Sequence, residues 1–346
     1  MQKVCQTLHD NGYAVFLVGR KSSNSLPLVR PYKTYRIKTF FRKGFLGLAE
    51  WNIRLFFKLV FTKKDILLSN DLDTLLANYM ASKFSKAKLV YDTHELFTEI
   101  PELIHRPKIQ KFWLKIEQFI FPKLKNVYTV CGSIADYYQA KYKVPVGVIR
   151  NLPLFKTVEP SKGFSFETAG KKVVFYQGAL NEGRGLELLI ETMPLLPNWL
   201  LVIAGDGTIS KELQQKVAKE KLTKKVIFMG RLLPEDLANL TPLATVGVSI
   251  EEDLGLSYHY ALPNKMFDYI HAKIPVLVSN LPEMRKIVKD YNVGNILYDR
   301  SAKNLAKQLE EIAKTPKSKW DFETAITELN WQKEAGQLLE IYRNLR

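Results

Sequence analysis

The sequence predicts an α/β protein built from two doubly wound domains, each with a parallel sheet covered by helices. Three observations support this. The length of 346 residues fits two domains of roughly 150 residues each. Short β-rich runs alternate with helical patterns along most of the chain. The alternation stops between residues 151 and 172, where Pro153, Pro160, Gly163 and Gly170 stand among polar residues, so we expect a domain junction there.

The expected strands are short runs rich in β-branched and aromatic residues, and helical periodicity fills the segments between them. In the first half they are Val15–Val18, Ile66–Ser69, Leu89–Tyr91, Val127–Val130 and Val148–Ile149. In the second half they are Val173–Tyr176, Leu200–Ile203, Val226–Met229, Val246–Ser249 and Val276–Ser279. Ligands of such sheets bind beyond the carboxyl ends of the strands, so candidate site residues are those that follow each strand.

Composition excludes several classes of protein. A hydrophobic content of 46% and a charged content of 25% are typical of a soluble globular chain. The two cysteines, Cys5 and Cys131, are too few for a disulfide framework or a thiolate metal site, which indicates a reducing compartment. The amino terminus has no apolar core segment of a signal peptide, so a cytoplasmic protein is expected.

The net charge of +16 is concentrated in the first half. Residues 1–150 carry 25 Lys and Arg against 11 Asp and Glu, whereas residues 151–346 are nearly balanced. Between Arg20 and Lys64, 12 basic residues meet one acid, Glu50, and aromatic residues are interleaved with them. This pattern suits an anionic membrane surface, a core face of a helix or a nucleic acid. We favour the inner face of a membrane over nucleic acid, because no recognised nucleic-acid module is present; charges including Arg42, Lys43 and Arg54 exclude a spanning helix.

The loop after the strand Val173–Tyr176 has the composition of an anion site. It contains Gly178, Gly183, Arg184 and Gly185, and a helix is expected from Leu186 to Thr192. Backbone N–H groups at a helix start and a bidentate guanidinium suit a phosphate or diphosphate. An ordinary turn with a solvated arginine is the alternative.

Three further strand ends in the second half could complete a nucleotide site. Gly205 and Gly207 follow one strand, and Gly230 and Arg231 end the next, where backbone groups could contact a base. Plain turns are the alternative for both.

The third strand-end segment carries the most specific signal of a nucleotide site. Pro263 suits the first turn of a helix, followed by Asn264, and Lys265 and Asp268 share one helix face. The lysine could bind the diphosphate and the aspartate the ribose hydroxyls. A surface ion pair between the two is the alternative.

In the first half, Asp92, His94 and Glu95 cluster after an apolar strand. They could be site residues, with Asp92 or Glu95 orienting His94, or a satisfied polar strand end. A metal site is a third option, but no second cluster supports it, so no metal is expected. The acids Asp71 and Asp73 are interpreted as turn and N-cap residues, with an acceptor contact as a further option.

Taken together, these motifs resemble the retaining GT-B glycosyltransferases of family 4 over nearly the whole chain. The resemblance rests on Tyr176-Gln177-Gly178 with Gly183-Arg184-Gly185, on Ala204-Gly205-Asp206-Gly207, on Pro263-Asn264-Lys265 with Asp268, and on Tyr91-Asp92-Thr93-His94-Glu95. It implies two Rossmann-like domains facing a cleft: residues 1–155 on the acceptor side and residues 156–330 binding a nucleotide-sugar. A closing helix within residues 331–346 is expected to return to the first domain, as in similar proteins.

The chain departs from the family pattern in three places. Ala179 stands where many members have an arginine, so Arg184 would take a phosphate role usually shared by two cations. The common glutamate pair appears as Tyr260 and Asp268. Members also begin with a strand and a glycine loop before the helix that opens this chain, so the first domain is expected to lack its first strand.

The resemblance implies transfer of a sugar to an acceptor with retention, without metal or cofactor. The basic first half indicates a lipid-linked or polysaccharide intermediate as that acceptor. Arg184 and Lys265 would stabilise the departing diphosphate, and His94 would contact the sugar. Two alternatives remain: a nucleotide-sugar epimerase or hydrolase on the same plan, and a catalytically inactive membrane-surface binding protein.

Overall fold

The computed structural model describes residues 1–22, 25, 27–41, 44–156 and 163–345. The chain divides into two compact units, which are described separately. Unit 1 contains Met1–Arg150 and Trp331–Arg346, and unit 2 contains Asn151–Asn330. The boundary lies five residues earlier than the expected one at residue 155. Arg42, Lys43 and Pro160, which entered the sequence predictions, lie outside the described residues.

Unit 2 contains a six-stranded sheet in the order β12-β11-β10-β7-β8-β9, in which every pair of neighbours is parallel. Its strands are β7 (Lys172–Gln177), β8 (Trp199–Ala204), β9 (Val226–Gly230), β10 (Val246–Ser249), β11 (Val276–Ser279) and β12 (Gly294–Leu297). Strand order reverses at β7, whose neighbours are β8 on one side and β10 on the other. The sheet is therefore doubly wound, as predicted.

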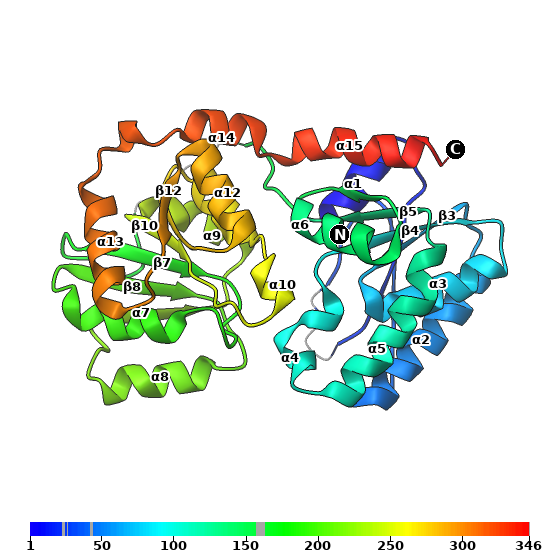
Figure 1. Ribbon diagram of the computed structural model, residues 1–346, viewed down its shortest axis with the longest axis horizontal. Coiled ribbons are helices and arrows are strands. Elements are labelled where there is room, and N and C mark those ends of the chain that lie inside the picture. Colours follow the sequence, from blue (N-terminus) through cyan, green and yellow to red (C-terminus); the bar gives the residue numbers. More distant parts are fainter. Residues whose placement is uncertain (23–24, 26, 42–43, 157–162, 346) are drawn as a thin grey trace. The chain divides into compact units, whose positions relative to one another are not determined.

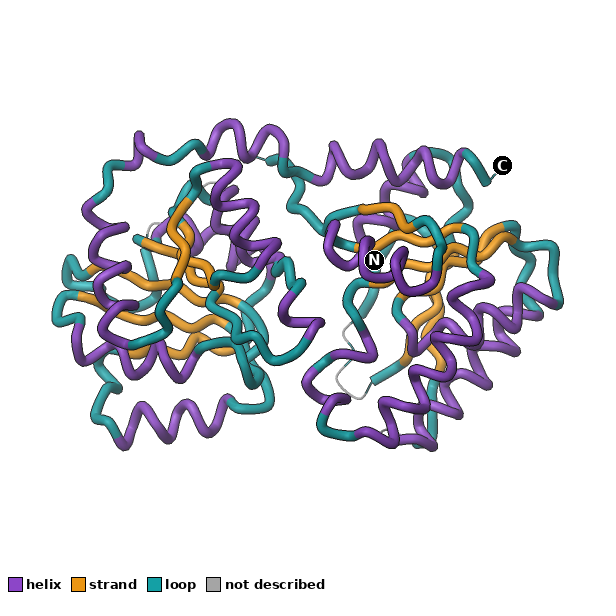
Figure 2. The backbone as a smooth tube through the Cα atoms, in the orientation of Figure 1, coloured by secondary structure: helices purple, strands orange, loops and turns teal. Residues whose placement is uncertain are grey.

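Helices cover both faces of this sheet (Figures 1 and 2). One face packs against α7 (Leu186–Thr192), α8 (Ser210–Lys219) and α13 (Ala302–Lys314). The other packs against α11 (Asn264–His271), α12 (Pro282–Tyr291) and α14 (Phe322–Glu328). The short helices α9 (Pro234–Leu240) and α10 (Leu256–His259) complete the unit. Val174 and Tyr176 of β7 join the first core and Val173 and Phe175 the second, which explains why this strand is a continuous apolar run.

The strands of unit 1 form two separate parallel sheets. One contains β1 (Phe16–Arg20) and β2 (Lys33–Ile37), and the other has the order β3-β4-β5-β6. Its strands are β3 (Ile66–Asn70), β4 (Lys88–Thr93), β5 (Asn126–Thr129) and β6 (Val146–Val148). The first helix, α1 (Gln2–Asp10), precedes every described strand of the unit.

The other helices of unit 1 are α2 (Gly44–Val60), α3 (Leu72–Lys83), α4 (Pro101–Ile104), α5 (Pro107–Ile120) and α6 (Gly132–Tyr142). The last helix of the chain, α15 (Trp331–Arg343), lies alongside α1 within this unit (Figure 1). Its buried Glu334 accepts hydrogen bonds from the backbone N and Nε of Arg150, each at 2.8 Å, and Trp331 Nε1 donates to Thr7 Oγ1. Residues at the two ends of the sequence therefore share one core.

Two strands were missed by the sequence analysis. β2 lies inside the basic and aromatic stretch, where four of its five residues are polar or aromatic and only Ile37 is buried. β12 is only four residues long and begins with Gly294. No helix in the described part of the chain is long and apolar enough to cross a membrane.

Candidate functional site

The switch point of the unit 2 sheet brings together the segments that follow β7 and β10. Arg184 lies in the loop after β7, and Glu251 follows β10 by two residues. Because these strands are neighbours, both residues lie at the same carboxyl edge of the sheet. Open α/β sheets bind ligands at this location.

Arg184 and Lys265 converge on the carboxylate of Glu251. Lys265 Nζ lies 2.7 Å from Glu251 Oε1, and Arg184 Nη1 lies 3.6 Å from the same oxygen. The Glu251 side chain is fully buried and that of Lys265 is 8% exposed, whereas Arg184 is one-quarter exposed. The two predicted phosphate-binding cations therefore share one anchor and form one cationic centre.

Hydrogen bonds and rings hold this centre in place. Glu251 Oε2 accepts from Ser249 Oγ at 2.8 Å. Lys265 Nζ lies 4.1 Å from the centre of the Tyr176 ring, and the Arg184 guanidinium carbon lies 4.7 Å from that of Tyr258. Burial alone would raise the pKa of Glu251, but the charges of Lys265 and Arg184 outweigh it, and the pKa is lowered. The carboxylate is therefore charged when the two cations are.

The glycine-containing segments at the ends of β7, β8 and β9 are hydrogen-bonded to one another through their backbones at the carboxyl end of the sheet. Gly178 N donates to the carbonyl of Ala204, and Gly205 N donates to the carbonyl of Gly230. A Cβ on Gly205 would lie 1.8 Å from the carbonyl oxygen of Gly178, and one on Gly207 would lie 2.3 Å from that of Leu180. These positions require glycine because two backbones touch there.

The remaining predicted donor residues surround this loop cluster. Gly183 has a φ of 75°, and a Cβ there would strike Leu254. Hydrogen bonds from Ser210 Oγ and Gly207 N lower the pKa of the Asp206 carboxyl. The charge of the exposed Arg231 lies near enough to lower it further, by a smaller amount.

The helix that carries Lys265 begins as predicted. α11 starts at Asn264, which is exposed, directly after Pro263. Asp268 Oδ2 accepts a hydrogen bond from Gln177 Nε2 at 2.8 Å, so this carboxylate is tied to the end of β7. Lys265 pairs with Glu251, and Asp268 pairs with Gln177. Lys265 and Asp268 therefore do not form the surface ion pair with each other that was the alternative.

In unit 1, His94 is held by polar residues from two neighbouring strand ends. Its Nε2 lies 3.2 Å from Asp92 Oδ2 at the end of β4 and 3.3 Å from Asn70 Oδ1 at the end of β3. Burial alone would lower the pKa of His94, but the hydrogen bond and charge of Asp92, with the charge of Asp71, outweigh it and raise the pKa. Glu95 contributes its backbone carbonyl, which accepts from Thr93 Oγ1.

Asp71 occupies the N-cap position of α3, but its side chain makes no cap hydrogen bond. Its Oδ1 instead accepts a hydrogen bond from the backbone N of His94 at 2.9 Å. Its φ of 55° is a left-handed conformation that costs energy in a residue other than glycine. Burial, followed by the charge of Asp71, raises the pKa of Asp73 to about 6.

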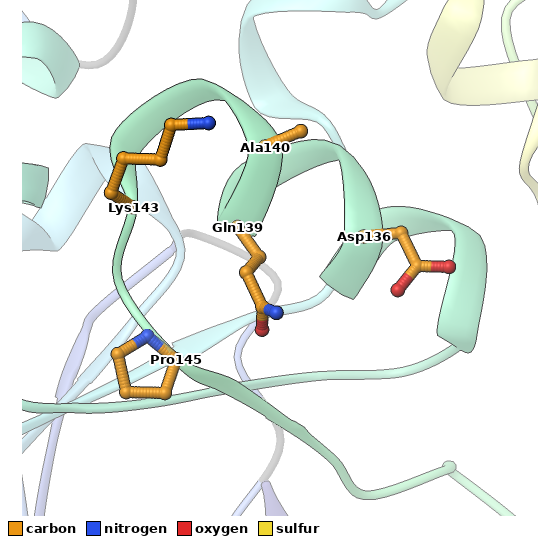
Figure 3. A pocket seen from close by; sticks show the side chains of 5 residues that line it. All are labelled: Asp136, Gln139, Ala140, Lys143 and Pro145. Carbon is orange, nitrogen blue, oxygen red and sulfur yellow. The ribbon is translucent and has the colours of Figure 1, made fainter.

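A shallow hollow of about 520 Å³ elsewhere in unit 1 is not lined by any of the predicted site residues (Figure 3). It lies at the end of α6 and just before β6, at the amino end of that strand. The side chains of Asp136 and Lys143 do not point toward one another. Among the described residues, no group of three or more His, Cys, Asp or Glu side chains is arranged to hold a metal ion.

The sequence analysis missed Glu251 and Tyr258 in unit 2 and the contact between Asp71 and His94 in unit 1. Glu251 follows a correctly predicted strand, but it is the first of three consecutive acids, Glu251 to Asp253, and nothing in the local sequence distinguishes it from the other two. The positive φ of Asp71 has no sequence signal, because nothing in its neighbours demands it.

Unit 2 is doubly wound with a cationic centre at its switch point, and unit 1 has parallel sheets; together they have the architecture of the GT-B fold. The solved sucrose-phosphate synthase from Thermosynechococcus elongatus superposes with a TM-score of 0.81 at 18% identity, over 99% of this chain and 92% of that one. Anabaena Alr3699/HepE, solved in complex with UDP-glucose, superposes with a TM-score of 0.71 at 14% identity, over 90% and 86% of the two chains. At these identities the likeness concerns the fold.

Sequence comparison assigns the family. Residues 1–152 match Glycosyltransferase Family 4, and residues 159–328 match Glycosyl transferases group 1, so the chain belongs to the group 1 and family 4 glycosyltransferases. A Campylobacter jejuni relative is named GalNAc-alpha-(1->4)-GalNAc-alpha-(1->3)-diNAcBac-PP-undecaprenol alpha-1,4-N-acetyl-D-galactosaminyltransferase. It is 26% identical over 256 residues, 72% of this chain and 65% of the relative. The chain spans about half the length of the curated relatives it matches.

Proposed function

We propose that this chain transfers a sugar, with retention, from a nucleotide-sugar bound by unit 2 to a lipid-linked glycan or polysaccharide intermediate. The observation that carries the proposal is the convergence of Arg184 and Lys265 on one buried carboxylate at the switch point. Two cations fixed at that edge suit a diphosphate better than any neutral ligand.

The proposed reaction develops charge where these cations lie. The bond between the anomeric carbon and the diphosphate oxygen breaks, a bond to an acceptor hydroxyl forms on the same face, and the hydroxyl proton passes to the departing phosphate. Arg184 and Lys265 stabilise the growing negative charge of the leaving group. The proposal requires no metal, so addition of EDTA should leave the rate unchanged.

Residues around the two cations receive supporting roles. The loops at Gly178, Gly205 and Gly207 let the phosphates approach closely because they carry no side chains, while their own N–H groups donate within the protein. Gly230 and Arg231 contact the base. Asp268, already tied to Gln177, accepts from the ribose hydroxyls. In unit 1, we assign His94 a contact with the transferred sugar, with Asp92 orienting the ring.

The first experiment measures nucleotide binding. HepE, which shares the fold, was solved with UDP-glucose, so UDP is tested first and GDP, ADP and CMP follow. Calorimetry on Arg184→Ala and Lys265→Ala should show binding weakened by roughly 10- to 100-fold, because a charge-assisted hydrogen bond contributes about 1.5–3 kcal/mol. Lys286→Ala, a 68% exposed lysine of α12, is the matched control and should bind normally. Unchanged binding by both site variants would refute the donor assignment.

The surface of α2 supports an acceptor at a membrane. Leu46, Ile53 and Phe57 of this helix are each more than half exposed, whereas Trp51 and Leu55 face the core. A surface helix that is apolar on its outward face marks an interaction site. The ring of Phe45 packs edge-on against that of Phe112 of α5, which extends the apolar face to a second helix.

Cations lie directly beside two further exposed rings, those of Phe40 and Phe119. The guanidinium carbon of Arg54 lies 5.0 Å from the ring centre of Phe40, and Lys123 Nζ lies 3.2 Å from that of Phe119. Rings with adjacent cations suit the headgroup region of an anionic bilayer. The named acceptor of the Campylobacter relative, a pyrophosphoryl-undecaprenol glycan, is a membrane lipid and fits this surface.

Vesicle sedimentation tests this surface. The chain should pellet with vesicles of phosphatidylglycerol, release at high salt, and ignore phosphatidylcholine. The double variant Ile53→Ser and Phe57→Ser should lose most of this binding while retaining UDP binding. If the variant pellets as well as the parent, the membrane proposal is wrong, whereas the donor assignment still stands.

A further inference from the structure

Arg300 of unit 2 lies in the same row of strand ends as the cationic centre. It follows β12 by three residues, in the segment before α13. In the sheet order, β12, β11, β10 and β7 are consecutive neighbours, and all four are parallel. Glu251 follows β10 and Arg184 follows β7. Arg300 therefore lies at one end of this row and Arg184 at the other.

The guanidinium of Arg300 holds the main chain of the segment that follows β10. Its Nη1 donates to the carbonyl of Ile250 at 3.0 Å and to that of Glu251 at 3.1 Å. The same nitrogen donates at 3.1 Å to Ser279 Oγ, and this buried hydroxyl donates to the Glu251 carbonyl. Arg300 Nη2 also lies 3.5 Å from Glu252 Oε1. One planar cation therefore contacts three consecutive residues.

The loop after β7 holds the other side of this segment. A Cβ on Gly185 would strike the carbonyl oxygen of Ile250, so the two backbones touch there. The backbone N of Glu252 donates to the carbonyl of Gly183 at 2.8 Å. The segment is thus fixed from both sides. The direction in which the Glu251 carboxylate extends is set by this fixed main chain.

We propose that Arg300 is a positioning residue for the sugar transfer, because it fixes the main chain from which the Glu251 carboxylate extends. That carboxylate in turn holds Lys265 and Arg184. The role rests on the proposed function, since it concerns the cations of the donor site. Arg300 does not bind the diphosphate itself. Its effect on the diphosphate passes through Glu251, and small displacements of positioned groups reduce their effect strongly.

Two other roles of Arg300 make different predictions. If its charge contacted the donor directly, a lysine in its place would keep much of the effect. If Arg300 only satisfied two backbone carbonyls, its loss would reduce stability by the same amount whether or not the Glu251 side chain is charged. The positioning role predicts neither result, because it requires both the planar shape of the guanidinium and the charge of Glu251.

Nucleotide binding tests the requirement for the planar shape. Arg300→Lys keeps the charge but cannot reach both carbonyls and Ser279 Oγ at once. It should weaken UDP binding, measured by calorimetry, by roughly 5- to 50-fold. Uridine binding, measured by NMR, should not change, because only the diphosphate meets the cations. The matched control is Arg285→Lys, which alters a single hydrogen bond to Asn280 Oδ1 and should bind UDP as the parent does.

Thermal unfolding tests the requirement for the Glu251 charge and needs no nucleotide. Arg300→Lys should lower the midpoint by about 3 °C or more in the parent, and by less than half as much when Glu251→Gln is already present. Ser279→Ala removes the second hydrogen bond to the Glu251 carbonyl and leaves the guanidinium intact. It should show the same dependence, and it carries both tests if Arg300→Lys does not fold.

Two results would overturn the positioning role. One is an equal loss of stability with and without the Glu251 charge. The other is UDP binding as tight as that of the parent in both Arg300→Lys and Ser279→Ala. A parent chain that does not bind UDP would count against the donor assignment instead, and the unfolding comparison would then decide the role of Arg300 by itself.

Discussion

Glu251→Gln is the most informative single change in unit 2. Glutamine has nearly the shape of glutamate and can still accept the hydrogen bond from Ser249 Oγ. It removes only the charge that holds Lys265 and Arg184 together. The variant therefore tests whether the buried carboxylate anchors the cationic centre.

The expected magnitude follows from the geometry. At an effective dielectric constant of about 20, a charge pair at the 2.7 Å separation of Lys265 and Glu251 gains about 6 kcal/mol, and the 3.6 Å contact of Arg184 about 5 kcal/mol. Desolvation offsets much of this, and loss of one partner of a buried pair typically costs about 3–5 kcal/mol. For a unit of this size, that cost lowers the thermal midpoint by roughly 10 °C.

The assay is thermal unfolding followed by calorimetry with UDP. Because the pKa of Glu251 is lowered in the folded chain, its stabilisation is present above its unfolded pKa and is lost as pH falls through the folded pKa. The parent should therefore approach Glu251→Gln in stability at acid pH. The variant should also bind UDP less tightly, since its cations lose their fixed positions.

The double variant Glu251→Gln with Lys265→Met provides the decisive comparison. It removes both the carboxylate and the ammonium, so no lysine charge remains buried without its partner, and it should be more stable than Glu251→Gln alone. A single variant with the midpoint of the parent, or a double variant that gains nothing, would refute the role of Glu251 as an anchor.

Three other predictions concern positions outside this pair. Asp92→Asn should lower the pKa of His94, measured by NMR titration of the ring, and an unchanged titration would contradict the contact between the two residues. The stabilisation from charged His94 is present below its unfolded pKa and is lost as pH rises through the raised folded value, so this stabilisation should shrink in the variant. Gly205→Ala should cost about 2 kcal/mol or more by thermal unfolding and weaken UDP binding, because its Cβ would strike a backbone carbonyl; normal binding would show that the loops have room. Glu334→Gln should cost about 3 kcal/mol by removing the buried partner of Arg150, and limited proteolysis should then release α15 faster than in the parent; equal release would mean that other contacts hold the helix.

Local pattern was sufficient where a segment carries its own signal. The apolar run Val173–Tyr176 predicted β7, and the glycines after it predicted the loop that carries Arg184. Pro263 predicted the start of α11 and so the location of Lys265. β2 and β12 could not be predicted, because their few apolar residues become strands only through pairing with β1 and β11.

The sequence by itself determined the two-domain α/β class, the cationic residues Arg184 and Lys265, and the cluster of Asp92 with His94, because each depends on residues close together in the chain. Only the tertiary structure decided that Glu251 joins both cations, since that contact requires β10 to lie beside β7. Strand order is set by pairing between distant segments, so contacts such as those of Glu251 are not encoded in local sequence.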